Sequence, residues 1–164
     1  MSPPPPPDAS GFVLDRFLPY LLSAANNRLS RLFAQRHLAE LGLTIPEWRV
    51  LATVGSLGTT GATAISGRTA MDKVKVSRAV AGLLDQRLLR RVPDPADGRA
   101  WLLSLTRRGR TIHDRIVPRA LAFDAELAAA VPPAELEVFR SALARLETRM
   151  AELGGADPDP AAGD

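Results

Sequence analysis

The stretch that decides the fold runs from Met71 to Leu105 and reads MDKVKVSRAVAGLLDQRLLRRVPDPADGRAWLLSL. Asp72 is a typical helix N-cap residue, and the apolar residues after it recur every three or four positions, as on one face of an amphipathic helix. The residues from Leu88 to Val92 lead into a strand, and those from Ala100 to Leu105 alternate as in a half-buried strand. Between them, Asp97-Gly98 is a strong hairpin-turn signal. The stretch therefore predicts a helix followed by a β-hairpin.

A short helix is predicted directly before this stretch, from about Thr63 to Ala70, with Ile65 and Ala70 facing inward. Two helices joined by so tight a turn form a helix-turn-helix. In the second helix, the expected buried face consists of Val76, Val80, Leu83 and Leu84. The opposite face is expected to be small near its middle and basic at its N-terminal end, and it consists of Val74, Lys75, Arg78, Ala81 and Gly82, flanked by Lys73 and Ser77.

The outward face of the second helix has the properties that a DNA groove requires. A helix N-terminus carries a partial positive charge that favours phosphate, and a helix-turn-helix places its N-terminal residues on base edges in the major groove. The candidate DNA-binding residues of this helix are Lys73, Val74, Lys75, Ser77 and Arg78.

The hairpin loop allows two interpretations. In the first, Asp97 only makes the turn and Arg99 is a solvated side chain, and spacing alone favours this interpretation. In the second, Arg99 at the wing tip reaches a narrow minor groove, and Asp97 orients its guanidinium group.

Helices are also predicted before the helix-turn-helix. The segment from about Asp15 to Leu41 reads as one long helix with Pro19 in its first turn and Gly42 as its C-terminal cap. Its apolar stripe consists of Leu18, Leu22, Ala25, Leu29, Leu32 and Phe33. Thr44 and Glu47 then form a capping box for a second helix. The buried face of this second helix is expected to contain Trp48, Leu51 and Val54.

Two further helices are predicted after the hairpin. Thr106 caps the first, which runs to about Ala130 and is expected to kink at Pro118. The second runs from about Ala134 to Leu153 and carries a seam close to a heptad pattern. The stripes of the long helices fit either a dimer interface or an intrachain bundle, and the sequence does not separate the two.

The composition narrows the class of protein. Eleven Lys or Arg and four Asp or Glu lie between residues 62 and 110, whereas the rest of the chain has ten and fourteen, so a basic middle lies between acidic flanks. Such a distribution suits a module that binds a polyanion. The chain has no Cys, which excludes disulfides and thiolate chemistry. No signal peptide and no membrane-spanning apolar run is found, so we expect a cytoplasmic protein that does not engage a membrane.

Motifs of catalysis are missing from the sequence. It contains no Gly-rich phosphate loop, no HExxH, no GxSxG and no cluster of His and carboxylates, so neither an enzyme nor a bound cofactor is expected. His37 and His113, the two imidazoles, lack the close spacing of metal ligands, and no metal site is expected.

The chain resembles the MarR family of winged helix-turn-helix regulators. The resemblance is carried by DKVKVSRAV at 72–80, by DPADGRA at 94–100, and by LLSLT at 102–106 running into RRG at 107–109. It implies a mainly α fold with a small β-hairpin wing. A single domain at 12–153 would lie between disordered tails at 1–11 and 154–164. Its winged helix-turn-helix would span about 44–106, and its dimerisation helices about 15–41 and 107–153.

The resemblance also implies a function. A homodimer would bind a pseudo-palindromic duplex operator, with Lys73, Lys75, Ser77 and Arg78 at recognition-helix positions and Asp97 and Arg99 as the wing pair. The favoured function is a repressor that a small aromatic or anionic effector releases from DNA. The alternative is a winged-helix protein whose basic face binds another protein or RNA. Ser66-Gly67 departs from the family pattern, which puts backbone contacts from the short helix in doubt.

Overall fold

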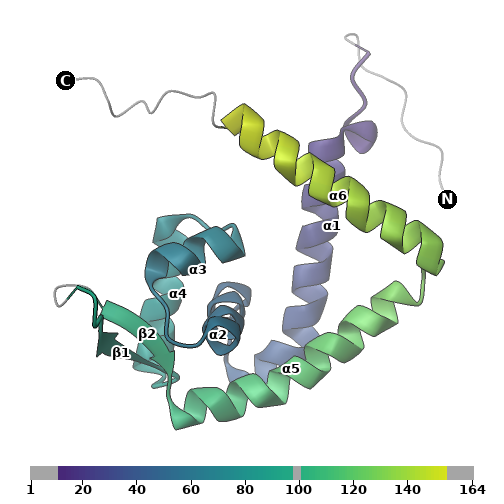
Figure 1. The fold of residues 1–164 in the computed structure, drawn as a ribbon. Coiled ribbons are helices and arrows are strands. Elements are labelled where there is room, and N and C mark those ends of the chain that lie inside the picture. Colours follow the sequence, from purple (N-terminus) through teal and green to yellow (C-terminus); the bar gives the residue numbers. More distant parts are fainter. Residues whose placement is uncertain (1–10, 98–100, 155–164) are drawn as a thin grey trace, which may run out of the picture. The chain divides into compact units, whose positions relative to one another are not determined.

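The computed structural model describes residues 11–97 and 101–154, and their fold is mainly helical with a two-stranded wing, as predicted (Figure 1). The described elements are α1 (Leu18–Phe33), α2 (Ile45–Leu57), α3 (Ala62–Thr69), α4 (Lys73–Asp85), β1 (Leu89–Pro93), β2 (Trp101–Leu105), α5 (Arg107–Ala128) and α6 (Pro133–Gly154). The chain divides into two compact units between Ala120 and Leu121, within α5. The predicted tails lie outside the described residues except for Gly11 and Gly154, and Gly154 ends α6 rather than opening a tail.

The N-terminal helix is shorter than the single helix predicted from Asp15 to Leu41. A 3-10 turn at Leu14–Arg16 is followed by an extended Phe17, and α1 begins only at Leu18. Pro19 fits this start, because in the first turn of a helix its missing N–H costs nothing, whereas further inside a helix its ring would clash with the carbonyl four residues earlier. After α1 the chain continues as a π-helical segment, Ala34–Leu38, and a 3-10 segment, Ala39–Leu41. Gly42 ends the helix with a φ of 64°, as predicted.

Helix α2 supplies the centre of the core in the first unit. Thr44 and Glu47 form the predicted capping box, in which the backbone N–H of each residue donates to the side chain of the other. Leu51 and Val54 are fully buried, as expected, and Val50 joins them. Trp48 is only half-buried, and its ring lies 6.0 Å from the ring of Phe33.

The turn between α3 and α4 corrects one prediction. Ile65 is fully buried as expected, but Ala70 is exposed and caps α3 with a φ of 50°. This left-handed residue redirects the chain so that Met71, not Ala70, enters the core. The hydroxyl of Ser66 donates to the carbonyl oxygen of Met71 at 2.6 Å and holds the turn in place.

The wing is an antiparallel pair of strands. Leu89 pairs with Leu105, and Pro93 pairs with Trp101 at the other end of the ladder. Thr60, which precedes α3, makes a bridge with Leu103 through two backbone hydrogen bonds of 2.8 and 3.0 Å. The wing is therefore attached to the helix-turn-helix through backbone as well as side chains.

Helix α5 begins where its cap was predicted. The hydroxyl of Thr106 accepts a hydrogen bond from the backbone N–H of Gly109 at 2.9 Å. The helix runs through Pro118 to Ala128, and Ile116 is fully buried. Two of its arginines, Arg115 and Arg119, bind Glu40, and the hydrogen bond from Arg119 is the main cause that lowers the pKa of that carboxyl group.

Helix α6 lies in the second unit and differs from the other helices in its exposure. No residue of α6 is buried, although Val138, Phe139, Met150 and Leu153 are large and apolar. The predicted seam is thus only partly covered in a single chain, because Leu136, Leu143 and Leu146 are half-buried whereas Phe139, Met150 and Leu153 are exposed.

Candidate nucleic-acid interface

The N-terminus of α4 is built around Asp72. Its Oδ1 atom accepts a hydrogen bond from the backbone N–H of Lys75 at 2.7 Å, as an N-cap residue does, and its Oδ2 atom lies 3.1 Å from the Nζ atom of the same lysine. The backbone hydrogen bond is the main cause that lowers the pKa of Asp72, and the lysine side chain adds to it. The start of α4 is therefore fixed by its own sequence.

The first two turns of α4 expose every residue of this helix that the sequence proposed as a DNA contact. The exposed residues are Lys73, Val74, Lys75, Ser77 and Arg78. Val74 is 59% exposed, although it is apolar and adjacent to a packed face. In the major groove an apolar side chain can contact a thymine methyl group, while lysine, arginine and serine can bind base edges or phosphates. The geometry thus gathers suitable groups on one short helical surface.

The buried side of α4 holds the helix against the core and includes Val76, Ala79, Val80 and Leu83. Leu84, expected on this side, is half-buried. Gly82 was predicted on the outward face, and this prediction is wrong. A Cβ atom at Gly82 would overlap the Oε1 atom of Glu47 in α2, so this position faces the core helix rather than the surface. Ala81, also predicted on the outward face, is exposed, so only Gly82 is removed from that face.

The wing tip is described only in part. Asp97 is exposed, whereas Arg99 lies outside the described residues. The described part of the loop is organised by Asp94, whose Oδ1 atom accepts a hydrogen bond from the backbone N–H of Ala96 at 2.9 Å. Such a bond from a side chain to the backbone two residues on is an Asx turn. The turn signal recognised in the sequence was Asp97-Gly98, whereas Asp94 was not predicted to have this role, although an Asp followed by Pro is also a turn signal.

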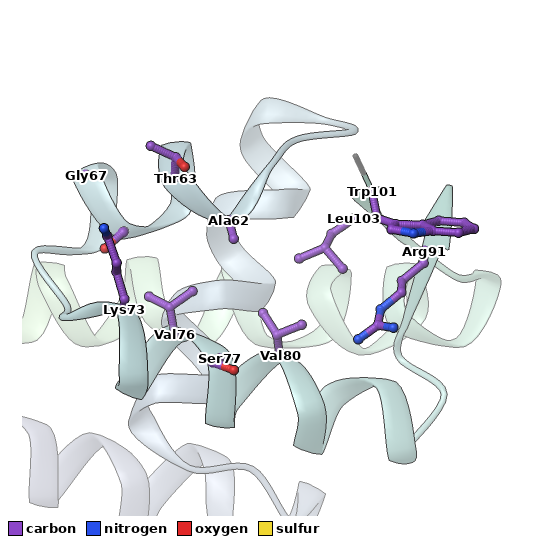
Figure 2. A pocket seen from close by; sticks show the side chains of 11 residues that line it. Ala62, Thr63, Gly67, Lys73, Val76, Ser77, Val80, Arg91, Trp101 and Leu103 are labelled. Carbon is purple, nitrogen blue, oxygen red and sulfur yellow. The ribbon is translucent and has the colours of Figure 1, made fainter. Parts of the chain in front are cut away.

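A cavity of about 730 Å³ lies between α3, α4 and the wing. Figure 2 shows Lys73 and the α3 residues at one end and Arg91 and Trp101 of the wing at the other, with Val76, Val80 and Leu103 between them. Trp101 is 59% exposed because its side of β2 faces this cavity rather than a packed core. Neither Arg91 nor the cavity was among the features predicted from the sequence. Trp101 and Leu103 are two residues apart in β2, so their side chains lie on the same side of the strand. This spacing was the signal in the sequence that both face the helices.

No cluster of three metal-binding side chains occurs among residues 11–97 and 101–154. His113 is packed against Gly55, where a Cβ atom would overlap its imidazole ring, and its Nδ1 atom lies 2.8 Å from Oδ1 of Asp114. His37 lies against Phe33, with ring centroids 5.1 Å apart. Across the same residues, every helix is too short or too polar to cross a membrane.

These features define a winged helix-turn-helix DNA-binding protein. The family model described as "MarR family" matches residues 41–100, which include α2, α3, α4 and β1. Together with the relatives below, this match shows that the chain belongs to the MarR family, whose members are DNA-binding transcriptional regulators and not enzymes.

Solved structures resemble the chain over most of its length. A probable transcriptional regulator from Pseudomonas aeruginosa is 32% identical, with a TM-score of 0.72 over 81% of this chain and 98% of that chain. BpsR from Bordetella bronchiseptica, whose DNA binding is regulated by 6-hydroxynicotinic acid, is 27% identical, with a TM-score of 0.71 over 90% and 99%. A mutant of MarR from E. coli, complexed with operator DNA, is 20% identical and shares the fold, with a TM-score of 0.69 over 79% and 92%. A search of curated proteins gave no significant match.

Proposed function

We propose that this protein is a repressor that binds a pseudo-palindromic duplex operator as a homodimer and leaves it when a small aromatic or anionic effector binds. The observation that carries the proposal is the exposed N-terminal half of α4, which presents Lys73, Val74, Lys75, Ser77 and Arg78 together. A helix-turn-helix uses this part of its second helix to contact base edges.

The cations on α4 differ in how free they are to contact DNA. Lys75 forms an ion pair with the N-cap Asp72, so part of its charge is already compensated within the helix. Arg78 lies one turn further along, on the same exposed surface. We therefore assign base recognition first to Arg78, which can bind a guanine bidentately, and phosphate binding to Lys73 and Lys75. Val74 and Ser77 complete the surface.

The wing provides the second contact in this proposal. Arg99 is assigned to the minor groove, where a narrow A·T-rich segment attracts an arginine, and Asp97 is assigned to orient it. Support comes from the hairpin itself, which is tied through Leu103 to the helix-turn-helix that carries α4. A wing attached in this way would keep a fixed distance from α4.

A second copy of the chain is the proposed cover for the exposed apolar side chains of the long helices. Helix α1 exposes Leu18, Tyr20, Leu21 and Leu29, and α6 exposes Val138, Phe139, Met150 and Leu153. Exposed apolar side chains in such number are characteristic of an interface rather than of a solvated surface. A dimer with twofold symmetry would present two copies of α4 to half-sites about one helical turn apart.

The cavity beside α4 is our proposed effector site. Its middle is apolar, and Arg91 and Lys73 can bind an acidic group while Trp101 offers a ring face to an aromatic one. BpsR, at 27% identity, responds to an aromatic acid of this kind. Because Lys73 and Ser77 line the cavity and are also proposed DNA contacts, an effector there would compete with the operator.

The proposal is tested by selecting binding sites from a random duplex library with the full chain, and then measuring the affinity for the enriched site and for a scrambled duplex over a salt series. We expect an inverted repeat to be enriched and its affinity to fall with salt, since phosphate contacts release counterions. Failure to enrich any duplex would contradict the proposal. Equal binding to enriched and scrambled DNA would point instead to a basic face for RNA or a protein partner.

A further inference from the structure

The carboxylate of Glu47 connects two helices in the core of the first unit. Only 8% of this residue is exposed. Its Oε2 atom accepts hydrogen bonds from the backbone N–H and the hydroxyl of Thr44, both at 2.8 Å. Its Oε1 atom accepts a third hydrogen bond, of 3.2 Å, from the Nε2 atom of Gln86. One oxygen therefore caps α2, while the other is directed at the C-terminal end of α4.

Gly82 brings α4 close to this carboxylate. A Cβ atom at Gly82 would overlap Oε1 of Glu47, and that oxygen cannot move freely because the carboxylate is held by three hydrogen bonds. Gly82 and Gln86 lie four residues apart, on the same side of the helix. Glycine inside a helix is unfavourable by about 1 kcal/mol relative to alanine, so its presence here is accounted for by this close approach. Glu47 thus contacts α4 at two points, one turn apart.

We propose that Glu47 is a positioning residue for operator recognition, acting through Gly82 and Gln86 on the tilt of α4. This inference rests on the proposed function, in which the N-terminal half of α4 contacts the operator. Gly82 lies about 13 Å along the helix axis from Lys73 at a rise of about 1.5 Å per residue. A tilt of about 5° about Gly82 would then displace the N-terminal end by about 1 Å, which is enough to break a base-edge hydrogen bond.

A simpler role for Glu47 would be to cap α2 and nothing more. The two roles can be separated at Gln86, because Gln86→Glu leaves both residues of the capping box unchanged. In this variant the new carboxylate is directed at the Oε1 atom of Glu47, and two groups that can only accept hydrogen bonds face each other. The variant therefore removes the contact to α4 and retains the cap on α2.

The reciprocal substitution provides the rescue. In the double variant Glu47→Gln/Gln86→Glu, the amide of residue 47 can donate to a carboxylate at residue 86, so the hydrogen bond to α4 is restored with its polarity reversed. The matched control is Thr44→Ala, which weakens the cap and leaves Gly82 and Gln86 unchanged. All of these variants keep the described cations of α4.

The experiment measures the affinity of the full chain for the operator selected with the wild-type protein and for a scrambled duplex, with thermal melting in parallel. Gln86→Glu is expected to lose about tenfold in the ratio of operator to scrambled affinity, because the hydrogen bond between Glu47 and residue 86 is replaced by repulsion of two carboxylates and α4 is displaced. The double variant should recover most of this ratio. Thr44→Ala should lower the melting temperature without changing the ratio.

The inference is overturned if Gln86→Glu keeps the wild-type ratio, or if the double variant melts like the wild type but fails to recover it. Failure of the proposed function is recognised separately, because the wild-type protein would then select no operator at all. If Gln86→Glu does not fold, Gly82→Ala tests the approach of α4 to Glu47 at a second point. That variant raises helix propensity in α4 and should nevertheless reduce the ratio.

Discussion

Lys75 lies 3.1 Å from Asp72, measured from Nζ to Oδ2, on the exposed N-terminal turn of α4. The same aspartate accepts a hydrogen bond from the backbone N–H of Lys75. One acidic residue thus caps the helix and partly neutralises a cation that we assign to DNA. This pairing limits the positive charge of the surface and explains why we separate the roles of Lys75 and Arg78.

Asp72→Asn should reduce the pH dependence of the free energy of unfolding. The cap itself should be kept, because asparagine is also a good N-cap residue. The pKa of Asp72 is lowered in the folded protein, so its ionised form contributes stability above the unfolded value of 3.8. That contribution is lost as the pH falls through the lowered, folded value. Urea unfolding of both proteins at neutral and at acidic pH measures it. The wild-type protein should lose more stability on acidification than Asp72→Asn, and equal losses would contradict the assignment.

Arg78→Ala should reduce operator affinity by about 1–3 kcal/mol and relax the preference at the base pair that it contacts. Lys75→Ala should weaken binding to all duplexes and lower the salt slope by about one, because a phosphate contact carries no sequence information. Fluorescence anisotropy against operator and scrambled DNA separates the two effects. If Arg78→Ala weakens both duplexes equally, the contact is to phosphate.

Arg99→Ala is predicted to weaken operator binding strongly while the protein stays folded, since the position falls between β1 and β2 in the sequence and is assigned to the minor groove. The control is Arg90→Ala, which removes an exposed arginine from β1 of the same hairpin. Affinity should be measured for operators with A·T-rich and G·C-rich flanks. An unchanged affinity of Arg99→Ala for both would exclude the minor-groove assignment.

Phe139→Glu should shift the protein from dimer to monomer, because it places a charge among the exposed apolar residues of α6. Ser141→Glu, at another exposed position of the same helix, is the matched control and should leave the dimer intact. Sedimentation at several protein concentrations gives the result. A Phe139→Glu protein that sediments as the wild type would mean that α6 does not form the interface.

Arg91→Ala should make DNA binding less sensitive to an aromatic acid, because the acidic group loses its arginine in the cavity. The probe is 6-hydroxynicotinate, added to the preformed operator complex and followed by anisotropy. We expect the wild-type complex to dissociate at lower probe concentrations than the variant complex. Identical release curves would place the effector elsewhere, and no release from the wild type would show that the effector is of another chemical type.

Local signals in the sequence predicted the helix starts well. The capping box of Thr44 and Glu47 and the N-cap at Asp72 were both predicted, because each involves partners only three residues apart. The exposed surface of α4 followed from the helical period. These features depend on the chain within one or two turns, which is the range over which residue spacing is informative.

The errors arose where a distant segment decides the environment. Gly82 lies on the outward side of a helical projection, yet it faces Glu47, thirty-five positions earlier in the chain. The sequence pattern places Ala70 in the core, but the backbone of Ala70 is left-handed, and Met71 is the residue that is buried. The cavity beside Trp101 likewise requires α3, α4 and the wing together. None of these arrangements is contained in the periodicity of a single element.

If the exposed apolar residues of α1 and α6 form a dimer interface, the concentration of this protein itself regulates how much of the operator is occupied. If two copies must associate before either α4 is correctly placed on an operator, occupancy at low abundance rises with the square of the monomer concentration. Doubling the synthesis rate would then raise the dimer about fourfold by mass action. The regulated genes would respond to protein dosage with a threshold, even at a constant level of effector.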